Sequence, residues 1–315
     1  MALAQFPLKN MFIVAAWLET CLYGIYFSLF WFSVYINSRW TRNGHRPSQV
    51  MFVSSILMFV VATAHVAMSC YRMIRGYVDF RNAPGGPVSF LAVIPDWTHT
   101  FNDVLFTLQS LLGDAMAVYR CWILWNRDYR FVILPFCLLL VSLVSGAKVT
   151  TSVADASTFK FDTSLRIWIT LFFSVAVAQN IITTTLMAVR LWLTEQKSMR
   201  FRMGSGAFLP VIRILVESAA LYLFLEILLL VFSALNYNVQ YILQDAMTPV
   251  IGITFGLIMV RIILRAQNQS SHGRARTIGS MALRRIVMDI SIPIEDGPDP
   301  KMEYGRESEN TGIDV

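Results

Sequence analysis

The feature that most constrains this chain is an apolar segment with charged side chains inside it. Residues 101–127, FNDVLFTLQSLLGDAMAVYRCWILWNR, are long enough to cross a bilayer, yet Asp114 lies at the centre and Arg120 near one end. A charged side chain at the centre of a bilayer costs roughly 3 to 15 kcal/mol, so such residues face other helices or a water-filled cavity. This segment is therefore predicted to be a helix inside a bundle.

The rest of the chain supplies enough apolar segments for that bundle. Each has about the 20 residues that a helix needs to cross roughly 30 Å of hydrocarbon. The composition, 56% hydrophobic and 15% charged, is far from the roughly 25% charged of soluble domains. We predict an all-α membrane protein, a seven-transmembrane helix bundle over residues 1–265, followed by a cytoplasmic, mostly disordered polar tail at 266–315. The predicted spans are about 11–36, 50–71, 101–125, 131–148, 166–190, 210–235 and 240–264.

Basic residues near the span ends set the predicted orientation, because cytoplasmic loops carry an excess of Lys and Arg. About twice as many flank the ends that follow the first, third, fifth and seventh spans as flank the opposite ends. The amino terminus is therefore predicted outside and the carboxyl terminus in the cytoplasm, with the plasma membrane favoured over internal membranes. Arg72, Arg75 and Arg81 are a local exception on the predicted outer side.

Several kinds of chemistry are not expected. The net charge of +6 is typical of cytoplasmic anchors on a membrane protein, so the predicted partner is the bilayer and not nucleic acid. The four histidines are dispersed without zinc-ligand spacing, the seventh span has no lysine to hold a retinal, and no GxxxxGK[ST] loop occurs. We predict no cofactor, no metal site and no catalytic residue.

Two charged residues are predicted at similar depth near the cytoplasmic side. At 1.5 Å per helical residue, Arg120 in the third span and Glu217 in the sixth lie roughly 8 to 10 Å from the cytoplasmic edge. One interpretation is a switch pair that opens when the sixth span moves, as a receptor requires. The other is structural: a constitutive pair, or Arg120 reaching the headgroups while Glu217 pairs with Arg213.

A second polar layer is predicted near the membrane midplane. It contains Asp114 and Asn180, with His65 and Glu226 somewhat further out. These four residues are the candidate ligand-binding site of an outward-opening cavity. The alternative is a buried hydrogen-bond network between helices, in which a lone histidine is an interior residue. Nearer the predicted outer mouth lie Glu19, Thr20, Asn102 and Asp103.

The seventh span has features that affect helix geometry and packing. Pro249 is expected to kink the helix and is a candidate hinge, since neighbouring hydroxyls can satisfy the freed carbonyl. Gly252 and Gly256, spaced four residues apart, are expected to let another helix approach closely.

Two motifs carry a resemblance to a known family. GDAMAVYRCWILWNRDYR at 113–130 and VESAALYLFLEILLLVFSALNYNVQYILQDAMTPVIGITFGLIMVR at 216–261 resemble a family of seven-span membrane proteins from basidiomycete fungi that has no established activity. The resemblance supports the seven-span fold. It is carried by Gly113, Asp114, Tyr119, Arg120, Trp125, Glu217, Ser218, Pro249, Gly252, Val260 and Arg261.

A looser similarity is to G-protein-coupled receptors, which share the span count, the orientation and an arginine motif in the third helix. Here Tyr119 replaces the acid before the arginine, and no cysteine lies at the outer end of the third span. We therefore expect a receptor-like protein that binds a small hydrophobic or lipidic ligand and a cytoplasmic signalling partner through loops 126–130 and 190–213. The alternatives are a membrane-embedded enzyme or transporter for a hydrophobic metabolite, with Asp114 and Glu226 as working acids, and a scaffold without a ligand.

Overall fold

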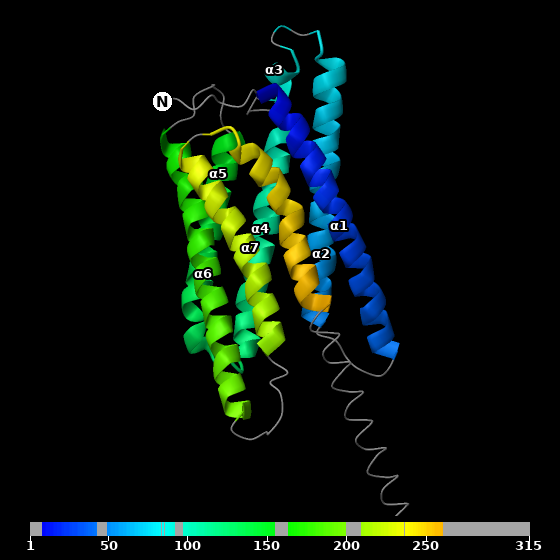
Figure 1. The fold of residues 1–315 in the computed structure, drawn as a ribbon. Helices are drawn as coiled ribbons and strands as arrows, with labels where there is room; N and C mark the ends of the chain where they lie inside the picture. The colour runs from blue at the N-terminus through cyan, green and yellow to red at the C-terminus, as the bar shows by residue number, and fades with distance from the viewer. Residues whose placement is uncertain are drawn as a thin grey trace, which may run out of the picture. The chain divides into compact units, whose positions relative to one another are not determined.

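The regular elements of the chain are helices. The computed structural model describes residues 8–42, 49–82, 84, 86–91, 97–154, 163–199, 209–235 and 237–260 of the 315 residues. Within these ranges the long helices run up and down in a bundle (Figure 1). They are α1 (Leu8–Arg42), α2 (Gln49–Ile74), α4 (Trp97–Leu124), α5 (Ile133–Ala154), α6 (Thr163–Met199), α7 (Leu209–Ala234) and the helix Gln240–Val260.

The predicted all-helical architecture is confirmed. Five helices are long and apolar enough to cross a membrane: α1, α2, α5, α6 and Gln240–Val260. α4 is long enough but more polar, and the part of α7 whose side chains are described is an apolar stretch, Ala219–Ala234, that is shorter than a span. The predicted tail at 266–315 lies outside the described residues.

The connection between α2 and α4 contains structure that the sequence did not predict. A π-helical turn, η1 (Arg75–Asp79), extends α2, and Pro87 begins the short helix α3 (Pro87–Leu91). Arg72 donates a hydrogen bond to the Leu91 carbonyl at 3.2 Å, and the Arg75 guanidinium lies over the Phe90 ring at 5.5 Å. Two of the three arginines that break the charge pattern therefore hold α3 against the end of α2.

The end of α4 is a tight reversal. Asn126 and Arg127 have φ of 56° and 64°, a left-handed conformation that commonly ends a helix. Asp128 then caps the single turn η2 (Tyr129–Phe131), and the Trp125 ring stacks on Phe131 with centroids 3.7 Å apart. This packing explains how the short NRDYR connection joins α4 to α5.

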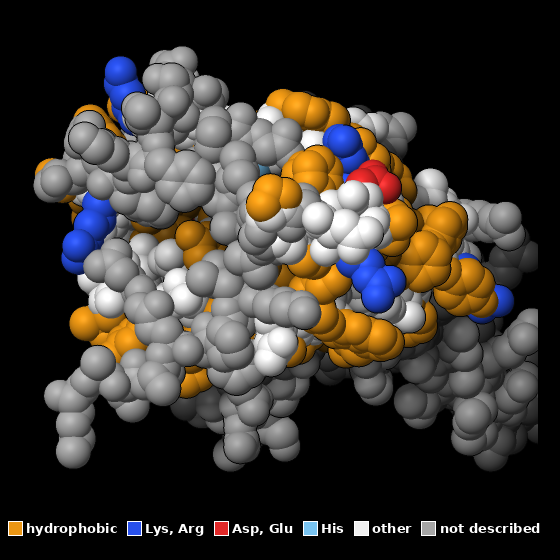
Figure 2. All heavy atoms as spheres, turned by 90° about the horizontal axis from the view of Figure 1, so that it is seen from above, with side chains coloured by type: hydrophobic (Ala, Val, Ile, Leu, Met, Phe, Trp, Pro, Cys, Tyr) orange, Lys and Arg blue, Asp and Glu red, His pale blue; other side chains and the backbone are white. Residues whose placement is uncertain are grey.

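The distribution of side chains is inverted relative to a soluble protein. Large hydrophobic residues lie on the outside of the bundle, for example Trp17 at 72% and Val53 at 61% exposed, while Glu19, His65 and Asp114 are 1% exposed. Figure 2 looks onto the end at which α1 and α4 begin, where Lys and Arg side chains stand apart among hydrophobic ones. Apolar exteriors around polar interior contacts suit helices surrounded by lipid.

The helix Gln240–Val260 lies at the centre of the bundle. Of the residues in its most apolar stretch 61% are buried, against 17% in α1 and 22% in α5. Two glycines allow close contacts with it: a Cβ at Gly252 would lie 2.4–2.6 Å from ring atoms of Tyr26 on α1, and a Cβ at Gly113 on α4 would lie 2.8 Å from the Ile251 side chain. The expected packing role of Gly252 is confirmed.

We predict that Gly252→Ala destabilises the bundle, because the added methyl group would overlap the buried Tyr26 ring, which packs against Phe59. The expected loss is about 1–3 kcal/mol, as for other overpacked sites, and is measured as a fall in Tm of the purified protein. The matched control is Gly256→Ala, where the nearest side-chain atom, Leu29 Cβ, is 3.8 Å away. This control should keep or slightly raise the Tm, and equal behaviour of the two variants would contradict the prediction.

Candidate functional site

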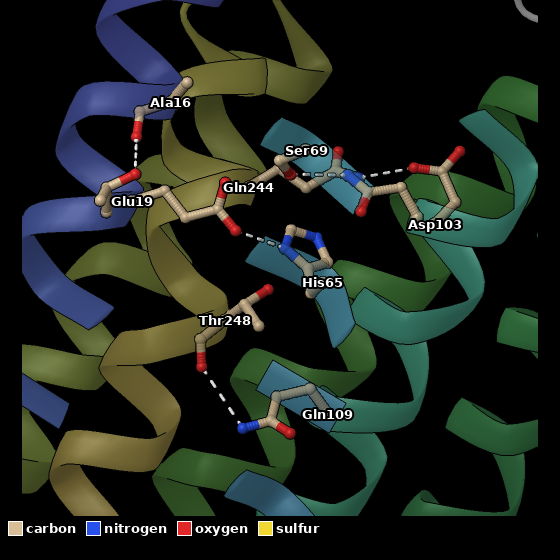
Figure 3. A network of polar contacts seen from close by, with 10 residues as sticks. Ala16, Glu19, His65, Ser69, Asp103, Gln109, Gln244 and Thr248 are labelled. Atoms are coloured by element: carbon tan, nitrogen blue, oxygen red, sulfur yellow. Dashed lines mark hydrogen bonds and ion pairs between the residues drawn. The ribbon is translucent and has the colours of Figure 1, made fainter. Parts of the chain in front are cut away.

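A buried acid and histidine join α1 to α2. Glu19 Oε1 lies 2.6 Å from His65 Nδ1, and both side chains are 1% exposed. Figure 3 shows the two side chains pointing toward each other in the interior. This short contact between two buried polar groups joins α1 to α2, while His65 Nε2 has no hydrogen-bond partner among the described atoms.

The polar network continues across the bundle. Asn102 on α4 donates to Ser69 on α2 at 3.4 Å, and Gln109 on α4 donates to the Thr248 carbonyl of the central helix at 3.4 Å. These contacts lie in the same region as the Glu19 pair (Figure 3). The Thr248 carbonyl immediately precedes Pro249. Gln109 therefore supplies a hydrogen-bond donor to the backbone beside the proline.

Asp103, near the start of α4, lines a cavity. Its Oδ1 accepts a hydrogen bond of 2.9 Å from Gln244 Nε2, and its Oδ2 lies 3.0 Å from His99 Nδ1, one turn earlier on α4. The carboxylate is thus held between two helices by two polar partners. Such restraint fixes its direction, as a binding group requires.

The cavity beside Asp103 has about 100 Å³ of free volume and lies among α4, α5, α6, α7 and the central helix. We call it the α4–α7 pocket. Its lining combines apolar and aromatic side chains with several polar ones, a mixture found in small-molecule sites. The polar lining is His99, Asp103, Arg166, Gln240, Tyr241 and Gln244, and the apolar lining includes Phe106, Phe172, Phe173 and Leu229.

A second polar cluster lies deeper along α4, where two acids meet one amide. Asn180 Nδ2 on α6 donates to Glu226 Oε2 on α7 at 2.8 Å and to Asp114 Oδ1 on α4 at 3.4 Å. Asp114 is 1% and Glu226 5% exposed. The buried hydroxyl of Tyr222, one turn from Glu226 on α7, adjoins the same carboxylate. We call these four residues the acid pair cluster.

A smaller cavity of about 40 Å³ adjoins this cluster on the side of Arg120. Asn180, Tyr222 and Arg120 all line it. Arg120 Nε donates to the Met116 carbonyl at 3.1 Å, its guanidinium lies 5.5 Å from the Phe255 ring centroid, and its Nη1 has no hydrogen-bond partner among the described atoms. The arginine therefore contacts the central helix through an aromatic ring.

The structure brings together three of the four predicted ligand-binding residues. Asp114, Asn180 and Glu226 form one cluster, whereas His65 contacts Glu19 in the other. None of the four lines the α4–α7 pocket, and only Asn180 lines the smaller cavity. The depth argument placed residues along the helix axis but did not distinguish the helix faces on which they lie.

Two further predictions have different outcomes. The side chain of Glu217 lies outside the described residues, so the proposed Arg120 switch pair stays a prediction. Pro249 lies within the continuous helix Gln240–Val260, and its role as a hinge also stays a prediction.

The pocket residues that sequence reasoning missed are Gln244, Tyr241 and Arg166 together with His99. Gln244 and Tyr241 lie one turn apart at the start of the seventh span, and Arg166 begins the fifth. Their signal was a cluster of polar residues at span ends on the same predicted side as Asp103. That signal alone does not show which side chains converge.

Among the described residues, no three His, Cys, Asp or Glu side chains lie close enough to share a metal ion. Comparison with known proteins adds no identification: no known protein family, curated protein or solved structure matches the chain. The function is therefore inferred from the two clusters and their cavities.

We predict that Glu19 and His65 act as a coupled pair. His65→Ala leaves a buried carboxylate without its partner and should destabilise the protein by roughly 1–3 kcal/mol. Glu19→Gln in the His65→Ala background should then cost less than it does in the wild type. Thermal unfolding of the two single variants and the double variant measures the coupling, and strictly additive losses would show that the contact contributes nothing.

Proposed function

We propose that this protein is a receptor-like membrane protein of seven spans that binds a small amphipathic ligand in the α4–α7 pocket. The observation that carries the proposal is the pocket itself, which is lined by a restrained carboxylate and by aromatic side chains. It lies at the end of the bundle where α4 and α6 begin, which is the predicted outer side. A ligand arriving from outside would therefore meet it first.

The lining suggests what the ligand looks like. Phe106, Phe172 and Phe173 offer a surface for an aliphatic or aromatic body. Asp103 and Arg166 offer an acceptor and a donor for a polar head. The small volume favours a compact molecule such as an alcohol, an amine or a volatile metabolite over a bulky one.

The opposite end of the bundle is where we propose that a signalling partner binds. Arg190 on α6 donates to the Leu124 carbonyl at 3.2 Å and lies 5.3 Å from the Trp125 ring centroid. α6 is thereby tied to the end of α4, directly before loop 126–130. A movement of α6 or the central helix would alter this basic surface, with Arg120 against Phe255 as the intervening contact.

A membrane-embedded enzyme or transporter is the second candidate. It is favoured by the convergence of Asp114 and Glu226 on one amide, since paired carboxylates can move protons. Against it, neither acid lines the α4–α7 pocket. Turnover of a bound ligand, measured by mass spectrometry after incubation, would decide for this candidate.

The seven-span topology makes a direct prediction in intact cells. An epitope tag at the amino terminus should react with antibody without permeabilisation, and a carboxyl-terminal tag only after it, because an odd number of spans places the ends on opposite sides. Immunofluorescence of the two tagged proteins at the cell surface measures this. Equal reactivity of both tags in intact cells would contradict the topology.

The ligand proposal predicts selective losses of binding. A panel of sterols, volatile alcohols, amines and short peptides is screened for a rise in Tm of the purified protein. For a compound that binds, Asp103→Asn should raise the Kd roughly tenfold or more, because a hydrogen bond to a charged group is lost. Phe173→Ala should also weaken binding by removing part of the apolar wall.

The matched control is Asp128→Asn, which removes an exposed acid at the opposite end of α4. This variant should bind the same compound with unchanged Kd. If Asp103→Asn and Phe173→Ala bind as the wild type does, the ligand site is not this pocket.

A further inference from the structure

An open groove of about 360 Å³ lies between α1 and α2. Figure 1 shows that α1 ends and α2 begins at the same end of the bundle, and the apolar stretches of the two helices end at Arg39 and begin at Gln49. The groove therefore lies at the level where the hydrocarbon of a bilayer meets the head groups. The described residues that line it are Val34, Asn37, Ser38, Thr41 and Phe52.

Asn37 has an unused hydrogen-bond acceptor in the wall of this groove. Its side chain is 6% exposed, and its Oδ1 has no hydrogen-bond partner among the described atoms. The hydroxyl of Thr41 does not supply one, because it donates to the Asn37 backbone carbonyl at 3.0 Å. A buried amide oxygen without a partner is destabilising. A molecule that brought a hydrogen-bond donor into the groove would remove this defect.

An aromatic surface continues from the groove along both helices. On α1, Tyr23, Phe27, Phe30 and Val34 follow one another at intervals of three or four residues and so lie on one face. The Phe59 ring of α2 stacks on Phe30 with centroids 4.0 Å apart, and its centroid is 5.9 Å from that of Phe27. Val34, which lines the groove, packs against the same cluster. Phe27 is 45% exposed, so part of this aromatic surface is open to lipid.

We propose that the groove between α1 and α2 binds a sterol from the surrounding bilayer. The single hydroxyl of a sterol lies at the level of the head groups, where it would donate to Asn37 Oδ1. The flat, rigid ring system would pack on the aromatic surface that includes Phe27 and Phe59.

A phospholipid fits this groove less well than a sterol. The oxygens of its phosphate are acceptors, and no Lys or Arg is among the described residues that line the groove. Arg39 follows Asn37 by two residues, but its guanidinium lies over the Tyr35 ring, 5.2 Å from the centroid. The groove therefore favours a neutral head group that donates one hydrogen bond.

The inference goes beyond the proposed function and does not depend on it. None of the groove residues lines the α4–α7 pocket. A sterol bound here would join the end of α1 to the start of α2 on the predicted cytoplasmic side. If no sterol binds, the proposed ligand site is unaffected.

The test is photolabelling of the purified full-length protein in phosphatidylcholine nanodiscs with a diazirine derivative of cholesterol that keeps its hydroxyl. Mass spectrometry should find the label within residues 34–41 and at Phe52. Excess cholesterol should displace the probe. Cholesterol methyl ether has the same rings but no hydroxyl proton, so it should compete about threefold less well or worse. Label found only elsewhere on the chain, or equal competition by the two compounds, would overturn the proposal.

Asn37→Leu tests the acceptor directly, because it removes the amide oxygen with little change of volume. It should lower the labelling of the groove about threefold or more. The matched control is Gln179→Leu on α6, which removes another buried amide that has no hydrogen-bond partner among the described atoms. This control should be labelled as the wild type is. Undiminished labelling of a folded Asn37→Leu variant would refute the proposal, and if that variant fails to fold, the competition on the wild type decides.

Discussion

The structure depends on the need of buried polar side chains for partners when the surroundings are apolar. In lipid there is no water to satisfy a stray amide or carboxylate, so each must find another helix. Glu19 contacts His65 on α2, and Gln109 donates to a backbone carbonyl of the central helix. Asn180 joins α6 to both α4 and α7. Hydrophobic contact alone does not fix the register of apolar helices in lipid. These polar contacts, with close packing at small residues, do so.

The two polar clusters lie at two different levels along α4. Near its start, Asp103 is held by Gln244 and faces a cavity with an aromatic wall. Further along, Asp114 belongs to a sealed cluster, and Arg120 reaches Phe255 on the central helix. The central helix contacts α4 at both levels. The same packed helix thus contacts α4 beside the α4–α7 pocket and again beside Arg120.

Much of the fold could be predicted from the sequence, because each membrane span must be long enough and apolar enough to cross the bilayer. The segment around Asp114 was correctly expected to lie inside the bundle, and Asp114, Asn180 and Glu226 do converge. His65 was grouped with them on depth alone, yet it faces Glu19. Depth follows from counting residues along a helix, whereas the direction of a side chain depends on the rotation of that helix, which packing decides.

Other features were invisible for similar reasons. Arg72 and Arg75 contact the short helix α3, whereas a count of basic residues treats those arginines only as topology signals. The pocket residue Gln244 is unremarkable in sequence and gains its role by meeting Asp103 from a helix far along the chain. Long-range convergence of this kind is set by tertiary packing and leaves no local pattern.

The polarity of α4 has a consequence for biosynthesis. This helix carries Asn102, Asp103, Gln109, Asp114 and Arg120 and does not reach the hydropathy of the five helices that suit lipid on their own. If α4 left the translocon by itself, those polar groups would be exposed to acyl chains. Its neighbours α2, made before it, and α5, made after it, both pack against it. We therefore expect α4 to enter the bilayer together with α2 and α5. The order in which the helices are synthesised then affects how the polar interior is assembled.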